Sequence, residues 1–223
     1  MRLLLTGGHG EIGAAIGARF AQAGFTVVAP SSRELDLSTD AGLGAFVAAQ
    51  EPFDAFVHCA GFNTPRPFEQ VPAEELTRSL WVNTLSFIRL CQLLAPGFRS
   101  LGGARVLAIS SIYGVISRER RLAYATSKHA LVGAVRSIAL ELGPDRVLVN
   151  ALAPGFIDTA MTRRNNDEAT IRKLEAAVPL RRLGQPADMA EVAFFLCSDA
   201  NRYLTGQNLV ADGGYTAGGF QPG

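Results

Sequence analysis

Cysteine is scarce in this chain, and no hydrophobic run is long. The three cysteines, Cys59, Cys91 and Cys197, are far apart and form no Cys-x-x-Cys motif. Their odd number and wide spacing argue against a disulfide framework and against a zinc site. The run Leu3–Leu5 leads directly into glycines, so it is too short for a signal sequence or a membrane span. We therefore expect reduced thiols, a cytoplasmic location and no metal site.

An excess of charge of either sign is also missing. The 223 residues carry 21 Lys+Arg against 20 Asp+Glu, a net charge of +1. This balance lacks the basic footprint of a protein that binds nucleic acid or a membrane surface, so we expect neither as a partner. Hydrophobic residues make up 48% of the chain, enough for a sizeable buried core.

Lysine is rarer still, since only Lys128 and Lys173 occur among the 21 basic residues. Lys128 stands four residues after Tyr124, so the two side chains share a face if the segment is helical. A free tyrosine has a pKa near about 10, and a neighbouring cation favours the phenolate. The pair therefore indicates a proton-transfer device, although a core tyrosine beside a solvent-exposed lysine would have the same spacing. Ser111, thirteen residues before Tyr124, is the third candidate of this site.

The N-terminal segment predicts a strand, a glycine-rich turn and a helix. An apolar run at Arg2–Thr6 leads into Thr-Gly-Gly-His-Gly-Glu-Ile-Gly, and Ile12, Ile16 and Phe20 then recur every four residues. Glycines here permit a tight turn, close approach of backbone to a pyrophosphate, and packing of the helix on the strand. The helix N-terminus offers N–H groups to the phosphates. A plain turn is the alternative. The candidate dinucleotide-binding residues are Gly7, Gly8, His9, Gly10, Glu11, Ile12 and Gly13.

The chain after the second predicted strand, Phe25–Ala29, bears on the choice of cofactor. Ser31, Ser32 and Arg33 come before the first acid, Glu34. A site that prefers NAD usually places an acid here, against the ribose hydroxyls. Two hydroxyls and an arginine suit a 2′-phosphate better, so we expect NADP(H) rather than NAD(H). The competing interpretation is a polar surface turn.

Strands and helices alternate along the rest of the chain. Predicted strands cover Phe53–Cys59, Arg105–Ile109 and Val147–Ala151, and predicted helices run from Ser38 or Thr39 to Ala49, from Pro72 to Leu94 and from Tyr124 to Leu142. This alternation predicts an α/β fold with a Rossmann-type, doubly wound parallel sheet, helices on both faces and a single domain over residues 1–223. Leu35–Leu37 is the exception, because it follows the second strand too closely for a helical crossover. Either that helix is missing or the third strand is vestigial.

Together these motifs resemble the short-chain dehydrogenase/reductase family, in its compact single-domain branch, over nearly the whole chain. The motifs are the loop at 6–13, Cys59-Ala60-Gly61, Asn83, Ser111, Tyr124 with Lys128, Asn150 with Pro154-Gly155, and the segments 182–186, 204–207 and 212–214. The resemblance implies an oxidoreductase that transfers a hydride between NAD(P)(H) and a small-molecule ketone or secondary alcohol.

The resemblance also implies roles for individual residues. Tyr124 would be the general acid in reduction and the general base in oxidation, Lys128 would lower its pKa and bind the nicotinamide ribose, and Ser111 would donate to the substrate oxygen. Asn83 would hold a water that links Lys128 to solvent. Further cofactor contacts are implied at Asp36, Leu37, Cys59, Ala60, Gly61, Tyr124, Lys128, Pro154, Gly155, Ile157 and Thr159.

Three features depart from the pattern of the compact branch. Glu11 stands where a glycine is usual, which gives the loop the spacing of the extended branch, whose members act largely on nucleotide sugars. His58 replaces the first residue of the family's Asn-Asn-Ala-Gly, and this puts a hydrogen bond from that side chain to a neighbouring strand in doubt. The short segment after the second strand puts the adenine pocket in doubt.

Residues 156–182 resemble the lid that closes over substrate in this family. The lid and the segment before Tyr124 are rich in basic residues, which suggests an acidic or phosphorylated substrate, or an acyl group on an acidic protein. Solvated helix faces and subunit contacts would explain the same residues. They are Arg118, Arg120, Arg121, Arg163, Arg164, Arg172, Lys173, Arg181 and Arg182. By the same resemblance we expect a homodimer or homotetramer, paired through the helices that carry Asn83 and Tyr124.

Two other functions stay open. A dinucleotide-binding sensor or regulator would use the fold without turnover, but it would have no need of Tyr124. An NAD-dependent epimerase or dehydratase acting on a sugar would need an acid after the second strand and a larger substrate region.

Overall fold

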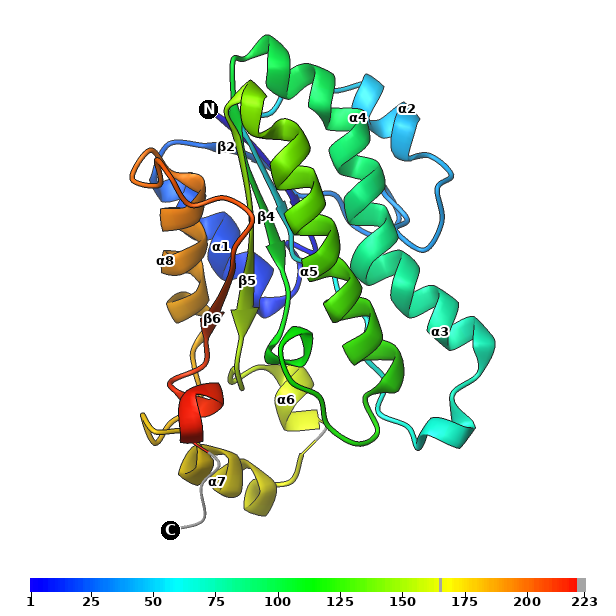
Figure 1. Ribbon diagram of the computed structural model, residues 1–223, viewed down its shortest axis with the longest axis vertical. Helices are drawn as coiled ribbons and strands as arrows, with labels where there is room; N and C mark the ends of the chain where they lie inside the picture. The colour runs from blue at the N-terminus through cyan, green and yellow to red at the C-terminus, as the bar shows by residue number, and fades with distance from the viewer. Residues whose placement is uncertain (165, 220–223) are drawn as a thin grey trace.

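The computed structural model describes residues 1–164 and 166–219, and at its centre lies a parallel sheet of six strands (Figure 1). The strands are β1 (Arg2–Thr6), β2 (Thr26–Val28), β3 (Ala55–His58), β4 (Ala104–Ile109), β5 (Val147–Pro154) and β6 (Asn208–Ala211). Their spatial order is β2-β1-β3-β4-β5-β6, with all neighbours parallel. The order reverses between β1 and β3, so the predicted doubly wound α/β fold is confirmed.

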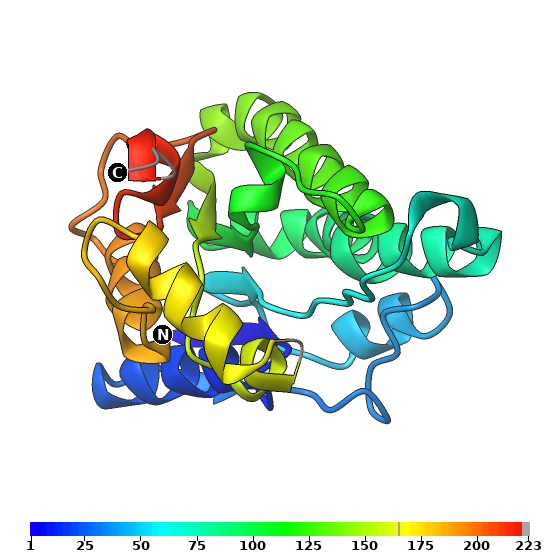
Figure 2. The same ribbon diagram turned by 90° about the horizontal axis from the view of Figure 1, so that it is seen from below.

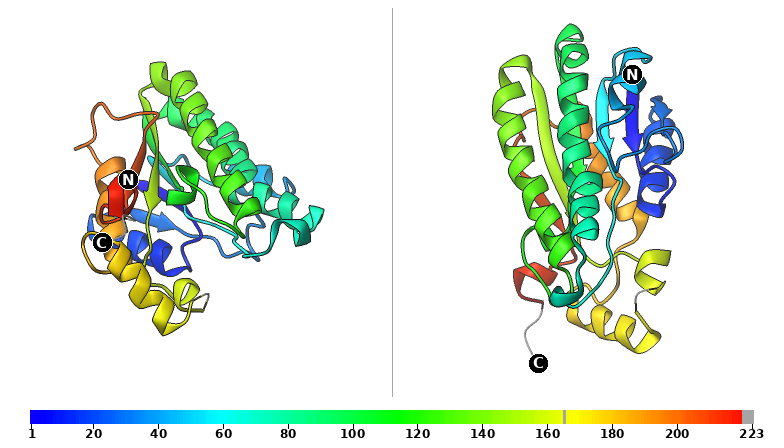
Figure 3. Two further views of the ribbon diagram at one scale, coloured as in Figure 1. Left: turned by 60° about the horizontal axis from the view of Figure 1, so that its bottom comes forward. Right: turned by 90° about the vertical axis from the view of Figure 1, so that its right-hand side faces the viewer.

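Helices cover both faces of the sheet. They are α1 (Glu11–Gln22), α2 (Leu43–Ala48), α3 (Ala73–Leu80), α4 (Ser86–Ser100), α5 (Leu122–Leu142), α6 (Ala160–Arg164), α7 (Glu168–Ala177) and α8 (Pro186–Cys197). Short 3₁₀ turns are η1 (Phe68–Gln70), η3 (Ile112–Gly114) and η4 (Gly143–Asp145), and π-helical turns are η2 (Trp81–Leu85) and η5 (Tyr215–Gly219). α1 and α8 lie on one face, and α4 and α5 lie on the other (Figure 3).

The alternation of side chains along the strands explains this arrangement. In β1, Leu3 and Leu5 pack on the side of α1 and α8, whereas Leu4 packs on the side of α4 and α5. All three are fully buried, as expected for a parallel sheet covered on both faces. Burial of one such side chain contributes about 1.5–3 kcal/mol relative to leaving it exposed. The hydrophobic core therefore has two halves with the sheet between them.

Residues 29–42, between β2 and α2, form neither helix nor strand. The crossover helix is missing, as one of the two interpretations of Leu35–Leu37 stated. The segment also contains no strand. The predicted helix start at residue 38 or 39 is wrong, because the Thr39 hydroxyl accepts a hydrogen bond from the Ala41 N–H and holds a turn instead. Gly42 then takes a φ of +83°, and α2 begins at the next residue.

The helix predicted over Pro72–Leu94 is a continuous run of α3, η2 and α4 that ends at Ser100. The expected end before Pro96 is therefore wrong. Pro96 removes a backbone N–H from α4. The fully buried ring of Phe98 nevertheless holds the last turn against the core. The middle segment, η2, contains Asn83, and π-helical turns are frequent at functional sites.

The predicted lid, residues 156–182, contains α6 and α7 and lies beneath the carboxyl ends of the strands (Figure 2). Its two ends are joined, since the Asp158 N–H donates to Gly184 O over 2.8 Å and the Gly184 N–H donates to Phe156 O over 2.9 Å. The segment therefore extends from a closed base toward the sheet edge where doubly wound folds bind ligands. Within the described part of the chain, no helix has the length and apolar character needed to cross a membrane.

Candidate active site

A cavity of about 1530 Å³ opens at the carboxyl ends of the strands. The predicted site residues that line it are Gly7, His9, Gly10, Glu11, Ile12, Gly13, Ser31, Ser32, Asp36, Leu37, Cys59, Ala60, Gly61, Ser111, Tyr124, Lys128, Pro154, Gly155, Ile157 and Thr159. Gly8, Arg33 and Asn83 are not part of its wall. Residues far apart in the sequence thus meet around a single space.

The glycine-rich turn depends on close packing of backbone. Gly7 has a φ of +72°, and a Cβ on it would lie 2.5 Å from the Ala60 nitrogen. A Cβ on Gly13 would lie 2.2 Å from the Gly7 oxygen, so α1 can start beside the turn only with glycine at this position. Gly10 is different, because a Cβ there would meet only the Gly7 oxygen, at 3.5 Å. Its missing side chain leaves room in the cavity for a ligand.

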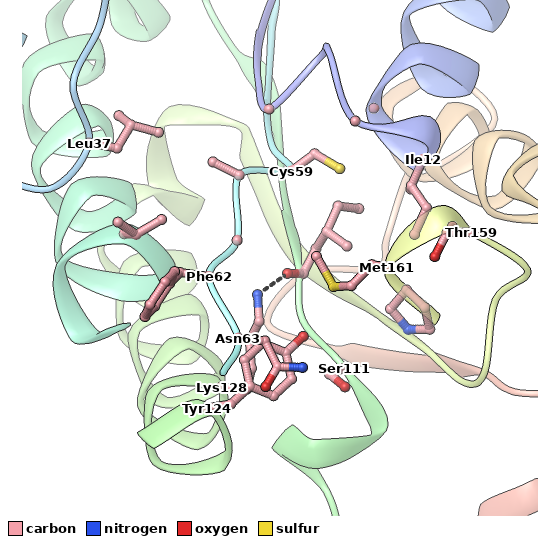
Figure 4. A pocket seen from close by; sticks show the side chains of 18 of the residues that line it. Ile12, Leu37, Cys59, Phe62, Asn63, Ser111, Tyr124, Lys128, Thr159 and Met161 are labelled. Carbon is pink, nitrogen blue, oxygen red and sulfur yellow. Dashed lines mark hydrogen bonds between the residues drawn. The ribbon is translucent and has the colours of Figure 1, made fainter. Parts of the chain in front are cut away.

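Three polar side chains lie beyond this turn (Figure 4). Ser111 follows β4, and its hydroxyl accepts a hydrogen bond from the Tyr113 N–H over 3.1 Å. Tyr124 lies in the first turn of α5, half-buried, with its ring 6.3 Å from the Tyr113 ring. Lys128 Nζ donates to Ile109 O over 2.7 Å and lies 5.6 Å from the centre of the Tyr124 ring. Tyr124 and Lys128 therefore share one face of α5.

Burial controls the titration of both groups. It lowers the pKa of Lys128 to about 8. It also raises the pKa of Tyr124 to about 12, against the smaller opposing effects of a hydrogen bond with Ser111 and the charge of Arg121. The net lowering of the Tyr124 pKa expected from the sequence is absent, because burial of the phenol dominates and the Lys128 ammonium donates to the Ile109 carbonyl. At neutral pH Tyr124 is protonated and Lys128 is mostly charged.

Asn83 supports the site from behind the cavity wall. Its amide oxygen accepts the Phe62 N–H over 2.7 Å, and its amide nitrogen donates to Phe62 O and Ser127 Oγ over 2.9 and 2.8 Å. The side chain is fully buried. It thereby joins the loop after β3 to the turn of α5 that carries Lys128. The water-holding role implied by the resemblance stays a prediction.

His58 makes the strand contact that was in doubt. It is fully buried, and its Nε2–H donates to Val82 O over 3.1 Å, since a carbonyl can only accept. Nδ1 then accepts the Thr6 hydroxyl proton over 2.9 Å, which links β3 to β1. Burial, with a smaller effect of the Lys128 charge, lowers the pKa of His58 to about 3. The ring is therefore neutral, and it connects both strands to η2.

Glu11, the unusual residue of the glycine-rich turn, contacts the lid. Its carboxylate accepts a hydrogen bond from the Ala160 N–H over 2.7 Å. Ala160 is the first residue of α6, so the contact joins the turn to the lid. Glu11 lines the cavity without filling it.

The end of the cavity beside β2 has a mixed wall, in which Ser31, Ser32 and Asp36 are polar and Leu37 is apolar. Arg33 is exposed and lies outside the wall, so only the two serines of the predicted phosphate-binding triplet reach the cavity. The Glu34 carboxylate accepts the Ser31 N–H over 2.8 Å and fixes the turn. Arg78, which the sequence did not point to, lines the cavity from α3 and lies 4.6 Å from the centre of the Phe62 ring.

Other lining residues were also not predicted. Phe62 and Asn63 come from the loop after β3, and Met161 comes from α6 (Figure 4). The first two directly follow Ala60-Gly61 at the carboxyl end of a strand, and this position could have identified them. Met161 lies in the lid, whose path over the cavity no local motif indicates.

Six of the nine basic residues predicted to meet an acidic substrate fall into two groups of three. Arg163, Arg172 and Arg182 form ion pairs with Asp158, Glu168 and Asp188, at 2.7, 3.9 and 2.6 Å. The first two pairs lie within the lid and the third joins its end to α8, and exposed pairs of this kind contribute little to stability. Arg118, Arg121 and Arg164 line the cavity instead. The hypothesis of an acidic substrate therefore applies only to these three cavity-lining residues.

Comparison with known proteins gives a consistent result. A family model described as enoyl-(acyl carrier protein) reductase matches residues 29–216. The 7α-hydroxysteroid dehydrogenase of Escherichia coli (strain K12) is 37% identical over 161 residues, which cover 72% of this chain. The match spans only 63% of the length of that relative.

Two solved structures resemble the whole fold. One, a protein from Beutenbergia cavernae described as a proposed NAD(P)-dependent gluconate 5-dehydrogenase with NADP bound at low occupancy, has a TM-score of 0.91 at 31% identity, covering 97% of this chain and 96% of that one. The other, a 7α-hydroxysteroid dehydrogenase complexed with NADH and 7-oxo glycochenodeoxycholic acid, has a TM-score of 0.90 at 32% identity, covering 96% and 93%. Fold, site and likenesses agree, and the chain belongs to the short-chain dehydrogenase/reductase family of oxidoreductases.

Proposed function

We propose that this protein is an NADP(H)-dependent oxidoreductase that interconverts a ketone and a secondary alcohol. The observation that carries the proposal is the meeting of Ser111, Tyr124 and Lys128 with the glycine-rich turn in one cavity. Such a cavity can hold a dinucleotide along the turn and a carbonyl group beside the two hydroxyls. A dinucleotide-binding sensor would have no use for the second part of this arrangement.

The residues around the cavity fit a dinucleotide. Gly10 leaves space in the wall, and the N-terminus of α1 has free N–H groups that suit a pyrophosphate. Lys128 would hold ribose hydroxyls, and Pro154 and Gly155 would border the nicotinamide end. When bound, the nicotinamide supplies or accepts the hydride.

Ser111 and Tyr124 handle the charge and the proton. In reduction, the carbonyl oxygen becomes negative as its carbon takes up hydride, and the Ser111 hydroxyl donates a hydrogen bond to that oxygen. The Tyr124 phenol transfers its proton to the same oxygen, which completes the alcohol. Its pKa of about 12 keeps this proton in place at neutral pH. The Lys128 charge stabilises the phenolate that remains, and oxidation follows the same steps in reverse.

We propose NADP(H) over NAD(H) because Ser31 and Ser32 line the end of the cavity beside β2 and Arg33 is the next residue. Hydroxyls and a guanidinium together suit a 2′-phosphate. One structural relative holds NADP and another holds NADH, so the relatives support NAD(P)(H) only as a class. We further propose a cytoplasmic homodimer or homotetramer paired through α5 and the continuous run of α3, η2 and α4 that carries Asn83, with residues 156–182 closing over the substrate.

The direct test is NADPH oxidation with a panel of ketones at neutral pH. Tyr124→Phe keeps the ring packed near Tyr113 but removes the proton donor, so kcat should fall by about 10²–10⁴-fold while NADPH still binds. Tyr203→Phe, on a side chain that is 96% exposed, is the control and should keep full activity. Equal activity of Tyr124→Phe and wild type would refute the proposed role, and failure to turn over any ketone or alcohol would refute the function.

A further inference from the structure

Arg121 stands at the substrate end of the cavity. It is the residue just before α5, three positions before Tyr124, and it is half-buried in the cavity wall. Its guanidinium carbon lies 5.9 Å from the centre of the Tyr113 ring, whose edge-to-face partner is Tyr124. Its positive charge reaches the phenol, since it opposes the rise in the pKa of Tyr124. A cation is therefore fixed beside the group that protonates the substrate.

The position of this guanidinium is set by hydrogen bonds between the segment before α5 and the loop after β3. Arg121 Nη1 donates to Asn63 Oδ1 over 3.1 Å, across to the loop after β3. The same loops are joined by backbone, because the Arg66 N–H donates to Arg120 O over 3.1 Å. Arg120 itself takes a left-handed φ of 62°, which forms the turn into Arg121. The guanidinium is thus positioned before any substrate arrives, and most of its donors remain available.

No carboxylate in the described residues pairs with Arg121, in contrast to the lid arginines Arg163 and Arg182. The acids that line the cavity are Glu11, Asp36 and Glu74, which come from α1, the loop after β2 and α3. None comes from the segment that carries Ser111 and Tyr124. Arg118, from that same segment, adds a second cation at the cavity wall. A half-buried guanidinium without a counter-charge favours an anionic ligand.

We propose that Arg121 binds a carboxylate of the substrate, so that the protein acts on oxo acids and hydroxy acids rather than on neutral ketones. The proposal rests on the proposed oxidoreductase function, because it assigns the substrate class of that site. Arg121 is then a specificity-determining residue that orients the reacting carbonyl toward Ser111 and Tyr124 through the acid group. Arg118 adds to the positive potential at the cavity wall but does not determine where the carboxylate binds.

The test compares binding of 4-oxopentanoate and of its methyl ester to the protein saturated with NADP⁺, where the ketone cannot be reduced. Arg121→Gln removes the charge at the cavity wall. The matched control is Arg120→Gln, which removes the same charge one residue earlier from an exposed side chain outside the cavity. Titration calorimetry gives the dissociation constant of each probe for each protein.

Wild type and Arg120→Gln should bind the acid at least about tenfold more tightly than the ester. Arg121→Gln should lose about 10- to 100-fold for the acid and less than about twofold for the ester. Equal binding of the two probes to wild type, binding of neither, or equal losses for both in Arg121→Gln would overturn the proposal. Turnover with NADPH distinguishes failure of the oxidoreductase function from failure of the role of Arg121. If the protein reduces the ester without preference for the acid, the oxidoreductase function stands and the role of Arg121 is refuted.

Discussion

His58 occupies a polar network below the cavity, between Thr6 of β1 and Val82 of η2. Both contacts require the neutral ring, because Nδ1 must accept while Nε2 donates. Protonation would turn Nδ1 into a donor and place a charge beside the rings of Phe56 and Phe87, whose centres lie 6.2 and 5.7 Å away. The network therefore makes the fold sensitive to mild acid.

The free energy of unfolding should decrease as the pH is lowered, because His58 becomes protonated on unfolding. The folded pKa of about 3 lies below the ordinary histidine value of 6.5, so the contribution of His58 is complete above pH 6.5 and is lost as the pH falls toward 3. Between pH 7 and pH 5 this loss is about 2 kcal/mol. Urea unfolding at several pH values measures it, and His58→Asn should remove this part of the slope. His129→Asn, on the exposed side of α5, should retain it; a slope that survives in His58→Asn would contradict the assignment.

Gly10 and Gly13 have different roles within the glycine-rich turn. Gly13→Ala should lower the free energy of unfolding by about 1–3 kcal/mol, since its Cβ would overlap the Gly7 oxygen at 2.2 Å. Gly10→Ala should change it by less than about 1 kcal/mol, because a Cβ has room there and the φ of −79° suits any residue. It should nevertheless weaken NADPH binding by about tenfold, a loss of about 1.4 kcal/mol. Chemical unfolding and an NADPH titration of both variants test these two predictions. A Gly10→Ala protein with normal NADPH affinity would show that the space beside Gly10 is not used by the cofactor.

The contact between Glu11 and Ala160 should control the opening of the lid. A hydrogen bond to a carboxylate contributes about 1.5–3 kcal/mol when shielded and less at an exposed position. We expect Glu11→Ala to raise hydrogen exchange at the Ala160 amide by about tenfold or more. Glu168→Gln, which removes the 3.9 Å pair with Arg172 on α7 and makes no contact with Ala160, should leave that amide unchanged. Unaltered exchange in Glu11→Ala would show that the lid is held elsewhere.

Elements with a strong local period could be predicted from the sequence, and those set by packing could not. The strands near Arg105 and Val147 and the helix of Tyr124 follow from hydrophobic patterns and flanking glycines. The end of α4 does not, because burial of Phe98 outweighs the helix-breaking effect of Pro96. The turns at residues 38–42 depend on a single hydroxyl contact and a left-handed glycine, which no pattern indicates.

The candidate site divides in the same way. The glycine-rich turn and the Tyr124–Lys128 pair are local motifs, so their residues could be identified directly. Arg121 and Asn63 meet across a sequence separation of 58 residues, and only the fold brings them together. The net rise in the pKa of Tyr124 comes mainly from burial, which the Tyr124–Lys128 spacing does not reveal.

At the scale of the whole molecule, the two halves of the core share one sheet, so the protein should unfold as one unit. Far-UV circular dichroism and the fluorescence of Trp81 should give coincident transitions on denaturation. NADPH at about 100 times its dissociation constant should raise the free energy of unfolding by about 2.7 kcal/mol. Two separate transitions would contradict the single-domain prediction, and an unchanged midpoint with NADPH would contradict binding to the native fold.

The measurement that tests the central claim most directly is a titration with NADPH and NADH, followed by energy transfer from Trp81. This is the only tryptophan of the chain, and it lines the proposed cofactor cavity. We predict saturable transfer with both, tighter binding of NADPH, and loss of that preference in Arg33→Ala. Tighter binding of NADH would contradict the NADP(H) assignment alone. Absence of transfer with either nucleotide would contradict the account of the cavity as a dinucleotide site, and the proposed oxidoreductase function with it.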